Sequence, residues 1–389
     1  MPKIQCIPAS VTRFENVPEP TDVMGVLKFL EGVGRTCYKS EERITDDSCM
    51  DFIRNIHNRK HWAMLEHYIF CFQIDEEDYD FLHDLMASSE EDSDVAEKMS
   101  YIRMSKWNAH GSHIVPTYLL STSATALNYL LEAMQAADDK VVRTGTNRNP
   151  IVRICEKMHS MFPMLFNDPC VDHSIDEVRD PGHCPGRDDI LILSRDEVRA
   201  LPAKLRRIHD FMSFRQITDR GVTHEDVRHR VMSFGHESTR YCNYSKKGYQ
   251  LIIPCWFSEA DKAKLENTED LREILFSNNT GDITIDAQAY RWLIRCKQAI
   301  DGYDELLCNG WTPQQARDVL PHSIKTEICM TARLNEWEHY FNMRVPTSAH
   351  PQMREMAIPM LQMATDYDAE IYRSIEDGFA DVLGNRRRF

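Results

Sequence analysis

Residues 228–241, RHRVMSFGHESTRY, place three arginines and two histidines in one short stretch. The chain around them has a formal net charge of −15 at pH 7, so this local positive charge stands out. A charge run without further context is most often a solvated surface. Arginine forks also suit the oxygens of phosphate groups, and short polar side chains suit the edges of bases. The residue types therefore leave two readings open, a solvated basic face and a nucleotide site.

The expected local structure decides which of these groups can act together. The stretch VTHEDVRHRVMSF, residues 222–234, has the pattern of a helix with Thr223 as its cap and Asp226 at the third helical position. On such a helix Arg228 and Arg230 project in widely separated directions, so they would serve two anions or two parts of one ligand.

The neighbouring polar residues complete this corner of the chain. Glu225 lies three residues before Arg228 and shares its helical face. Ser238 and Arg240 are two residues apart, which in an extended segment puts both on one side. Guanidinium groups, a hydroxyl and a carboxylate around one corner favour a nucleotide.

The motif also resembles the signature of a known family. Arg-His-Arg, seven residues and then Ser, here RHR-VMSFGHE-S, resembles the signature of the flavin-dependent thymidylate synthases, which are unrelated to the cysteine-nucleophile enzymes. Further blocks are similar to the family in the same order: HWAMLEHYIFCF, ITDRGVTHEDVRHR, GWTPQQARDVLP and TARLNEWEHYFNMR with SAHPQMRE. Together the blocks touch most of the chain outside roughly 76–205.

The resemblance implies a specific reaction and assembly. The family binds FAD, uses NADPH and 5,10-methylenetetrahydrofolate as co-substrates, and methylates dUMP to dTMP without a cysteine nucleophile. The flavin carries the chemistry, and the protein contributes binding, orientation and electrostatics. The family forms homotetramers whose active sites lie between subunits.

The resemblance also implies roles for individual residues. The catalytic role falls to Arg344, whose fixed charge would stabilise ionised N3 of the pyrimidine. The residues implied to bind dUMP are Glu225, Arg228, Ser238, Thr239, Arg240, Arg317 and Arg344. The residues implied to contact FAD are His61, Glu66, Arg228, His229, Arg230, His236, Arg333, Asn335 and His339. Trp337 and Phe341 are expected to be core residues instead.

Three departures from the family pattern bear on these assignments. The family usually has Asn-Leu-Arg where this chain has Arg333-Leu334-Asn335, an exchange of two flavin-contacting side chains. The motif commonly has Ser or Asn and then Gln or Glu where this chain has Gly235 and His236. A stretch similar to SGNxRA in related members is STSATA here, residues 121–126.

These departures keep other functions open. A flavin-dependent pyrimidine nucleotide hydroxymethylase of the same fold would trap the transferred methylene with water. A non-catalytic nucleotide-binding homologue is a second alternative, although the chain keeps its phosphate-suited arginines. A cysteine-dependent synthase is a third, because PCWF around Cys255 resembles a Pro-Cys nucleophile, but the His and Gln-Phe that follow in that family are missing. A Rossmann dehydrogenase is unsupported, because no GxGxxG follows a strand.

Composition sets the outer limits. The 389 residues are 42% hydrophobic and 28% charged, which is ordinary for a soluble globular protein. The acidic balance argues against general nucleic-acid binding. The N-terminus has no signal-like segment and no apolar run is long enough to span a membrane, so we expect a cytoplasmic protein, in the host cytoplasm if the source is viral.

The twelve cysteines form no CxxC pairs and are expected to be reduced. Cys170, His173, His183 and Cys184 have the ligand types that zinc prefers, but their spacing fits no common zinc pattern. We therefore expect no metal site.

Hydrophobic patterning predicts the elements that position these groups. Helices are expected at 45–60, 76–100, 121–137, 149–162, 285–309 and 350–373, and strands at 61–75, 210–221 and 248–257. The methionines at 353, 356, 360 and 363 have the spacing of a buried helix face. We expect a single α+β catalytic domain over residues 1–389, with a sheet flanked by helices and a largely helical insertion at about 76–205.

Overall fold

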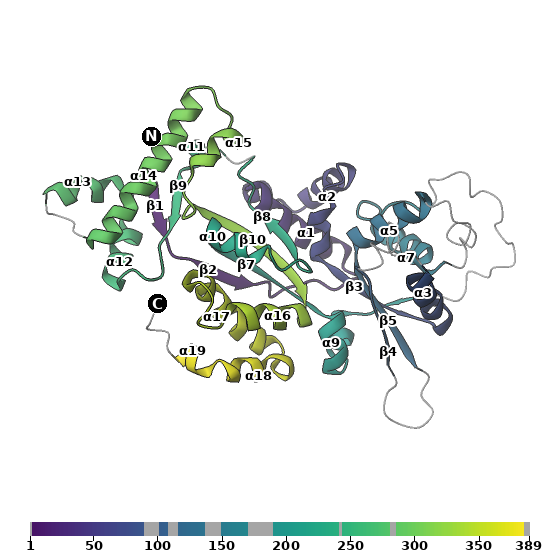
Figure 1. Ribbon diagram of the computed structural model, residues 1–389. Coiled ribbons are helices and arrows are strands. Elements are labelled where there is room, and N and C mark those ends of the chain that lie inside the picture. Colours follow the sequence, from purple (N-terminus) through teal and green to yellow (C-terminus); the bar gives the residue numbers. More distant parts are fainter. Residues whose placement is uncertain are drawn as a thin grey trace.

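The computed structural model describes residues 2–88, 101–107, 116–136, 149–169, 190–240, 243–280 and 285–384. Within these ranges helices and strands are mixed, which confirms the predicted α+β class. Two four-stranded sheets lie one beyond the other, and helices gather around both of them (Figure 1). No helix in the described ranges is long and apolar enough to cross a membrane.

The strands fall into three groups. They are β1 (Ile4–Ile7), β2 (Ser10–Arg13), β3 (Ile69–Ile74), β4 (Arg103–Trp107), β5 (Thr117–Ser123), β6 (Leu191–Ile192), β7 (Phe211–Asp219), β8 (Ser233–His236), β9 (Tyr249–Ile252) and β10 (Lys325–Arg333). The central sheet has the order β2-β7-β10-β8, the insertion sheet has the order β4-β5-β3-β6, and β1 pairs with β9. Both four-stranded sheets are antiparallel.

The helices surround these sheets. They are α1 (Val23–Tyr38), η1 (Glu41–Arg43), α2 (Ser48–Asn58), η2 (Trp62–His67), α3 (Glu76–Ser88), α5 (Ala124–Ala136), α7 (Pro150–Met161), α8 (Arg195–Arg199), α9 (Ala203–His209), α10 (Arg220–Asp226), α11 (Tyr244–Lys247), α12 (Glu259–Asn267), α13 (Arg272–Thr280), α14 (Ala287–Cys308), α15 (Pro313–Ala316), η4 (Arg317–Val319), α16 (Leu334–Arg344), α17 (Pro351–Tyr367), α18 (Ala369–Gly378) and α19 (Ala380–Gly384).

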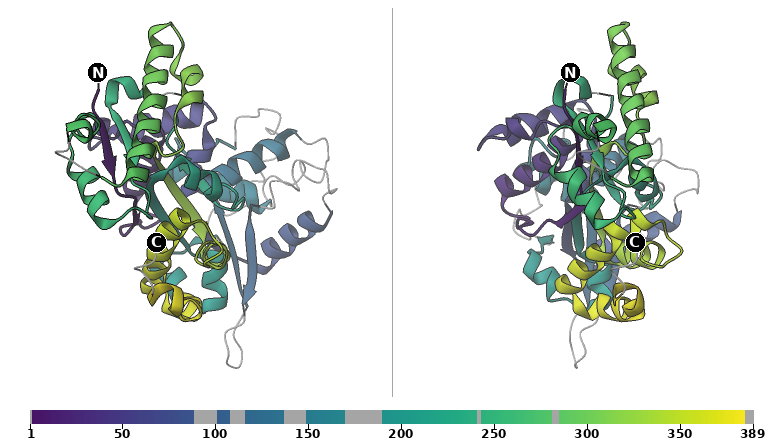
Figure 2. Two further views of the ribbon diagram at one scale, coloured as in Figure 1. Left: turned by 60° about the vertical axis from the view of Figure 1, so that its left-hand side comes forward. Right: turned by 90° about the vertical axis from the view of Figure 1, so that its left-hand side faces the viewer.

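Strand β10 is an interior strand of the central sheet, and its two faces pack against different helices. Its residues are buried except Arg333 at the end, because helices cover both faces. Successive side chains of a strand point to opposite faces. Ile328 and Met330 accordingly pack into the core with α16 and α17, while Glu327 and Thr331 face the side of α1 and η2. Figure 2 shows α16 to α18 gathered on one side of this sheet.

The insertion contains more than helices. Within residues 76–205, the helices α3, α5, α7 and α8 are accompanied by strands β4, β5 and β6. These strands pair around β3, which precedes the insertion in the chain. A shared hydrophobic core then joins this sheet to α1, α2, α5 and α7.

Several element boundaries differ from the predictions. The helix predicted from residue 121 begins at Ala124, because residues 121–123 end strand β5 and pair with β3. The segment from His61 begins as the 3₁₀ helix η2 and becomes a strand only at Ile69. The predicted helix 350–373 breaks at Asp368, whose side chain accepts from the backbone N–H of Ile371 and caps α18.

Other predictions are confirmed. Helices α2, α7 and α14 and strands β7 and β9 lie within their predicted ranges. Trp337 and Phe341 are fully buried. Of the methionines in α17, those at 353, 356 and 360 are buried and Met363 is half-buried at the edge of the same core. Part of the predicted helix 76–100, after Ser88, lies outside the described residues.

Candidate functional site

The loop between β7 and β8 holds the first group of predicted site residues. Asp219 ends β7 and accepts the backbone N–H of Val222 with its Oδ1 at 2.9 Å, so it caps α10. Thr223, the predicted cap, instead donates its hydroxyl to the carbonyl of Arg220. The cap prediction was therefore wrong, because the helix is capped at Asp219, four residues earlier than the pattern suggests.

The predicted helix over 222–234 was also wrong beyond its first turns. Helix α10 ends at Asp226, and residues 233–236 pair with β10 as strand β8. Strand pairing across the sheet outweighs the local helical pattern here. Arg228 and Arg230 consequently lie in an exposed turn, where neither side chain forms an ion pair or hydrogen bond within the described part of the chain.

Helix α16 brings Arg344 to the end of α10. Its Nη1 donates to Glu225 Oε2 at 2.6 Å and its Nη2 donates to the Glu225 carbonyl at 2.8 Å. Its Nε donates to His229 Nε2 at 2.9 Å. The arginine is thus held from three directions by the segment that carries the signature motif.

His229 is a neutral acceptor in this arrangement. Burial, the nearby charge of Arg344 and the ring of His339 lower the pKa of His229 to about 4. Its Nε2 accepts the bond from Arg344, so its proton lies on Nδ1 in the neutral ring. The rings of His229 and His339 are 5.7 Å apart. Glu225 and Arg344, which the resemblance assigns to dUMP, therefore lie beside His229 and His339, which it assigns to FAD.

A second group forms on the loop after β8. Arg317 in η4 donates its Nη1 to Thr239 Oγ1 at 3.0 Å. Ser238 Oγ accepts the backbone N–H of Arg240 at 3.3 Å. The backbone N–H of Ser238 donates to the carbonyl of Cys37 at the end of α1. The prediction of an extended segment through Arg240 was wrong, because β8 ends at His236 and residues 239–240 form a turn.

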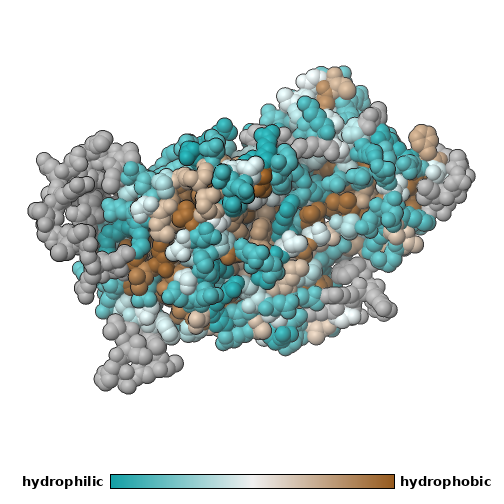
Figure 3. All heavy atoms as spheres, turned by 180° about the vertical axis from the view of Figure 1, so that it is seen from behind, coloured by the Kyte–Doolittle hydropathy of each residue, from teal (hydrophilic) through white to brown (hydrophobic). Residues whose placement is uncertain are grey.

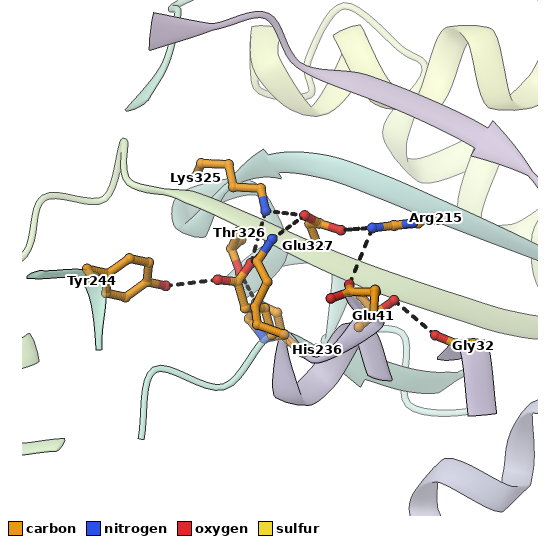
Figure 4. Close-up of polar contacts among 11 residues, drawn as sticks. Gly32, Glu41, Arg215, His236, Tyr244, Lys325, Thr326 and Glu327 are labelled. Atoms are coloured by element: carbon orange, nitrogen blue, oxygen red, sulfur yellow. Dashed lines mark hydrogen bonds and ion pairs between the residues drawn. The ribbon is translucent and has the colours of Figure 1, made fainter. Parts of the chain in front are cut away.

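Behind this loop lies a buried charge network that sequence reasoning missed. Glu327 of β10 lies between Lys325 and Arg215, and both cations contact its carboxylate (Figure 4). Lys39 Nζ, from the end of α1, is 2.5 Å from Glu327 Oε1. Lys325 also contacts Glu237 Oε2 at 3.2 Å. Because Glu237 directly precedes Ser238, the network anchors the second group to the central sheet.

The remaining predicted flavin contacts are spread more widely. His61 is exposed and its Nδ1 is 3.0 Å from the hydroxyl of Tyr38. Glu66 lies near Ser233, and its burial raises the pKa of its carboxyl to about 6. His236 Nε2 is 3.0 Å from Thr326 Oγ1, on the α10 side of the sheet.

Arg333 and Asn335 lie at the far end of β10. Arg333 Nη2 donates to the carbonyl of Ser121 in β5, so this side chain reaches into the insertion sheet. Burial and, to a smaller extent, the nearby charge of Arg103 lower the pKa of Arg333 to about 9. Asn335 Nδ2 donates to Glu336 Oε1 at 2.9 Å, while Asn335 Oδ1 is buried without a partner among the described residues.

The predicted site residues therefore form separate groups in one chain. Strand β10 has nine residues and spans about 26 Å from Lys325 to Arg333. Glu225 and Arg344 lie on the α16 side of the sheet, whereas the Ser238 backbone bonds to α1. The cavity that adjoins Glu225 is not lined by Ser238, Arg317 or Arg333.

A cavity of about 330 Å³ opens beside Glu225. Its wall includes Asp219, Trp256, Trp292 and His350. Trp256 is 49% exposed, and its ring lies edge-on to that of His350. Aromatic walls with a few polar groups are typical of small-molecule sites. Sequence reasoning did not find this cavity, because its residues come from five separate segments of the chain.

The cysteine and metal alternatives can be compared with the same structure. Cys255 is buried, and burial raises the pKa of its thiol to about 12, so it is protonated at neutral pH. This environment does not suit a nucleophile. The zinc-like residues Cys170, His173, His183 and Cys184 lie outside the described residues.

The described chain thus combines an α+β fold with arginines from several segments around one central sheet. A family model described as "Thymidylate synthase complementing protein" matches residues 209–367, which contain β7, β8 and β10. Over these residues the chain is similar to the flavin-dependent thymidylate synthases, which confirms the resemblance seen in the sequence.

Curated relatives match over the same part of the chain. The flavin-dependent thymidylate synthase of Geobacter sulfurreducens is 25% identical over 159 residues, which is 41% of this chain and 58% of the relative. That of Pyrococcus furiosus is 29% identical over 144 residues, 37% of this chain and 49% of the relative. That of Haloarcula marismortui is 27% identical over 169 residues, 42% and 64%. The chain therefore spans between about half and two thirds of the length of these relatives.

Proposed function

We propose that this protein is a cytoplasmic FAD-dependent thymidylate synthase. It would convert dUMP to dTMP with 5,10-methylenetetrahydrofolate as the carbon donor and NADPH as the reductant. The observation that carries this proposal is the set of three hydrogen bonds that Arg344 donates to Glu225 and His229, at the start of the signature motif.

Arg344 has the right groups left over for a pyrimidine. A guanidinium carries five N–H donors, and the bonds to Glu225 and His229 use three of them. One N–H on each terminal nitrogen then remains for a ligand. These paired donors would face a pyrimidine edge and stabilise negative charge at N3, which raises the electron density at C5.

The second group would hold the phosphate of dUMP. Arg317 and the Thr239 hydroxyl are already in contact, and the hydroxyl of Ser238 and the side chain of Arg240 are on the same loop. A guanidinium with adjacent hydroxyl donors suits phosphate oxygens. The buried network behind Glu237 would keep this loop in place during binding.

The residues present fit a flavin. Arg228 and Arg230 offer exposed guanidinium groups for a dinucleotide's phosphates. Asn335 Oδ1 and Arg333 Nε are a buried acceptor and donor that lack partners among the described residues, and they fit the amide-like edge of the ring. A bound flavin supplies hydride transfer. His61, Glu66, His229, His236 and His339 would orient it and limit water.

The separation of the groups supports a homotetramer with sites between subunits. Phosphate-suited residues lie near the start of β10 and flavin-suited residues lie near its end. Val227 and Val231 flank Arg228 and Arg230 in the chain, Met343 precedes Arg344, and all three apolar side chains are exposed. Hydrophobic patches also interrupt the hydrophilic rear face of the molecule (Figure 3). Such patches favour contact with another protein surface.

The direct test is the mass of the product. The purified protein is incubated without oxygen with FAD, NADPH, methylenetetrahydrofolate and dUMP, and the nucleotide is analysed by mass spectrometry. We expect a methyl increment. Unchanged dUMP despite bound flavin would contradict the proposal and favour the non-catalytic homologue.

The exchange at positions 333 and 335 favours one second candidate, a pyrimidine nucleotide hydroxymethylase. Arg333 is turned toward Ser121 of the insertion sheet, so a charge that the family places at the flavin is displaced. Such a change near the ring could let water, instead of hydride, complete the transfer. A hydroxymethyl increment in the same experiment would establish this reaction.

Binding of the pyrimidine beside Glu225 has a simple spectroscopic consequence. Because Trp256 lines the cavity there, dUMP is expected to change its fluorescence in the wild-type protein and in a Trp311→Phe variant. The change should be smaller in Trp256→Phe, where Trp292 remains as the second tryptophan of the cavity wall. Trp311 is a matched control, since it is 48% exposed and does not line the cavity. An undiminished signal in Trp256→Phe would place the ring elsewhere.

A further inference from the structure

A buried carboxyl lies directly behind the Arg344 group. Asp226 and Tyr340 are both fully buried, and the Tyr340 hydroxyl donates to Asp226 Oδ1 at 2.9 Å. The other oxygen, Oδ2, is buried without a hydrogen bond to any described residue. Burial of a charged carboxylate without full pairing is costly. The neutral acid is therefore the favoured form of Asp226 over a wide pH range.

The connection to the proposed site is short. Asp226 follows Glu225 in α10, and Tyr340 follows His339 in α16. The Tyr340 ring is 4.8 Å from the ring of His229, which accepts the Nε bond of Arg344. Asp226 and Tyr340 thus support both partners of Arg344 from the core side.

The groups around Asp226 come from three elements. From α10 and the turn after it come Glu225 and His229, and from α16 come His339, Tyr340 and Arg344. Strand β7 adds the uncharged amide of Gln216, which is 3.4 Å from the Tyr340 hydroxyl.

These groups act on Asp226 in opposite directions. Burial raises the pKa of Asp226, the Tyr340 hydroxyl and Arg344 lower it, Glu225 raises it and the Gln216 amide lowers it, and the net result is a pKa of about 7. Arg344 is the cation among these neighbours, and Glu225 already pairs with it. A second carboxylate that ionises nearby must compete with Glu225 for the same charge.

We propose that Asp226 is a positioning residue whose protonation state sets how much of the positive charge of Arg344 is available to a ligand. With Asp226 neutral, Arg344 is offset by Glu225 alone and its outward N–H groups can stabilise an anionic pyrimidine. With Asp226 ionised, its negative charge offsets part of the positive charge of Arg344 from the core side. The outward N–H groups then stabilise an anionic pyrimidine less. This inference rests on the proposed function for the identity of the ligand, but its coupling of two protein groups can be measured without one.

The first experiment measures that coupling directly. Infrared difference spectra of the full-length protein are recorded between pH 5 and 9, and the C=O band of a neutral carboxylic acid is followed. We expect one component of this band to disappear as pH rises through about 7 and to be missing in Asp226→Asn. Burial also raises the pKa of Glu66 to about 6 and that of Glu355 to about 7, and the signal of these two carboxyls should be the same in both proteins. Asp261→Asn is the matched control, because Asp261 is a buried carboxyl in α12, remote from Arg344 in the chain. This control should keep the Asp226 component.

Replacing the arginine then tests the coupling itself. Because coupling is reciprocal, Arg344→Gln should raise the midpoint of the Asp226 band by about one pH unit, since a cation that favoured the ionised form is gone. An unchanged midpoint in Arg344→Gln, or no titrating component that Asp226→Asn lacks, would overturn the proposal even if the protein is folded and active.

The second experiment links the coupling to the ligand. The dissociation constant for dUMP is measured by calorimetry at pH 6 and pH 8 in the wild type and in Asp226→Asn. The second ionisation of the dUMP phosphate, at about pH 6, changes binding in both proteins alike. Beyond that shared change, we expect binding to weaken from pH 6 to pH 8 in the wild type and not in the variant. A wild-type pH dependence that persists in full in Asp226→Asn would contradict the proposal. Failure of the proposed function is read separately, as no dUMP binding at either pH, and it leaves the infrared result standing.

Discussion

Replacing Arg344 with alanine is expected to lower kcat for dUMP methylation by about a hundredfold to a thousandfold. This is the typical effect of removing one preorganised donor from a developing negative charge, about 2.7–4 kcal/mol. The structure gives the reason why Arg344 is preorganised, since Glu225 and His229 hold three of its N–H groups before any ligand arrives. The measurement is steady-state kcat and KM with dUMP.

Stability should change little in the same variant. The side chain of Glu225 is 38% exposed, so water can solvate its carboxylate once Arg344 is gone. An ion pair of this exposure contributes at most about 1 kcal/mol. Thermal unfolding of Arg344→Ala therefore separates a catalytic effect from a folding defect.

Two further variants sharpen the result. Arg344→Lys keeps the charge without the planar fork, so it should recover only part of the rate. Arg373→Ala removes an exposed arginine of α18 that pairs with Glu376 one turn away, and it should leave kcat unchanged. Wild-type kcat in Arg344→Ala would exclude this residue from the chemistry and remove the main support for the proposed function.

The sequence predicted the parts of the fold whose pattern is local. Strand β7 and helix α14 follow from their own residues, because a run of apolar residues or a regular 3.6-residue period needs no partner to be recognised. Helix α10 shows the limit. Its pattern continues through Arg230, but β10 offers a pairing partner to residues 233–236, and that non-local contact ends the helix at Asp226.

The site was predictable to the extent that it lies in one motif. Glu225 and His229 could be placed near each other from their spacing, and the resemblance added Arg344, which the structure brings to both. The cavity beside Trp256 and the pair Asp226–Tyr340 could not be predicted, because each joins residues far apart in the chain. Lys325 and Glu327 did carry a signal, since opposite charges two residues apart in a strand share a face.

That buried pair leads to the second large effect. Glu327→Gln is expected to lower the free energy of unfolding by about 3–5 kcal/mol, the usual result of removing one partner from a buried ion pair. The Glu327 side chain is 5% exposed and contacts Lys39, Lys325 and Arg215. A neutral amide would leave these cations with only Glu237, which contacts the two lysines, and the partly exposed Glu41, 3.6 Å from Arg215. The measurement is urea unfolding at one fixed protein concentration, because any oligomer makes stability depend on concentration.

The free energy of unfolding should also depend on pH through the carboxyl of Glu327. Burial alone would raise the pKa of Glu327, but Lys325, Lys39 and Arg215 outweigh it and lower the pKa to about 2. A carboxyl whose folded pKa is below its unfolded value of about 4.3 contributes stability above that value. This contribution is lost as pH falls from about 4.3 toward 2, so the wild type should lose stability steeply in that window and Glu327→Gln should lose less.

An exposed pair provides the control for both measurements. Glu259 pairs with Lys262 on the surface of α12 at 2.9 Å, with 90% of its side chain exposed. Glu259→Gln should change the free energy of unfolding by less than about 0.5 kcal/mol. If Glu327→Gln behaves in the same way, the buried network is no more important than a surface pair. If the expected loss is found together with weaker dUMP binding, the network also holds the Ser238 loop, because Glu237 is bonded to it and directly precedes that serine.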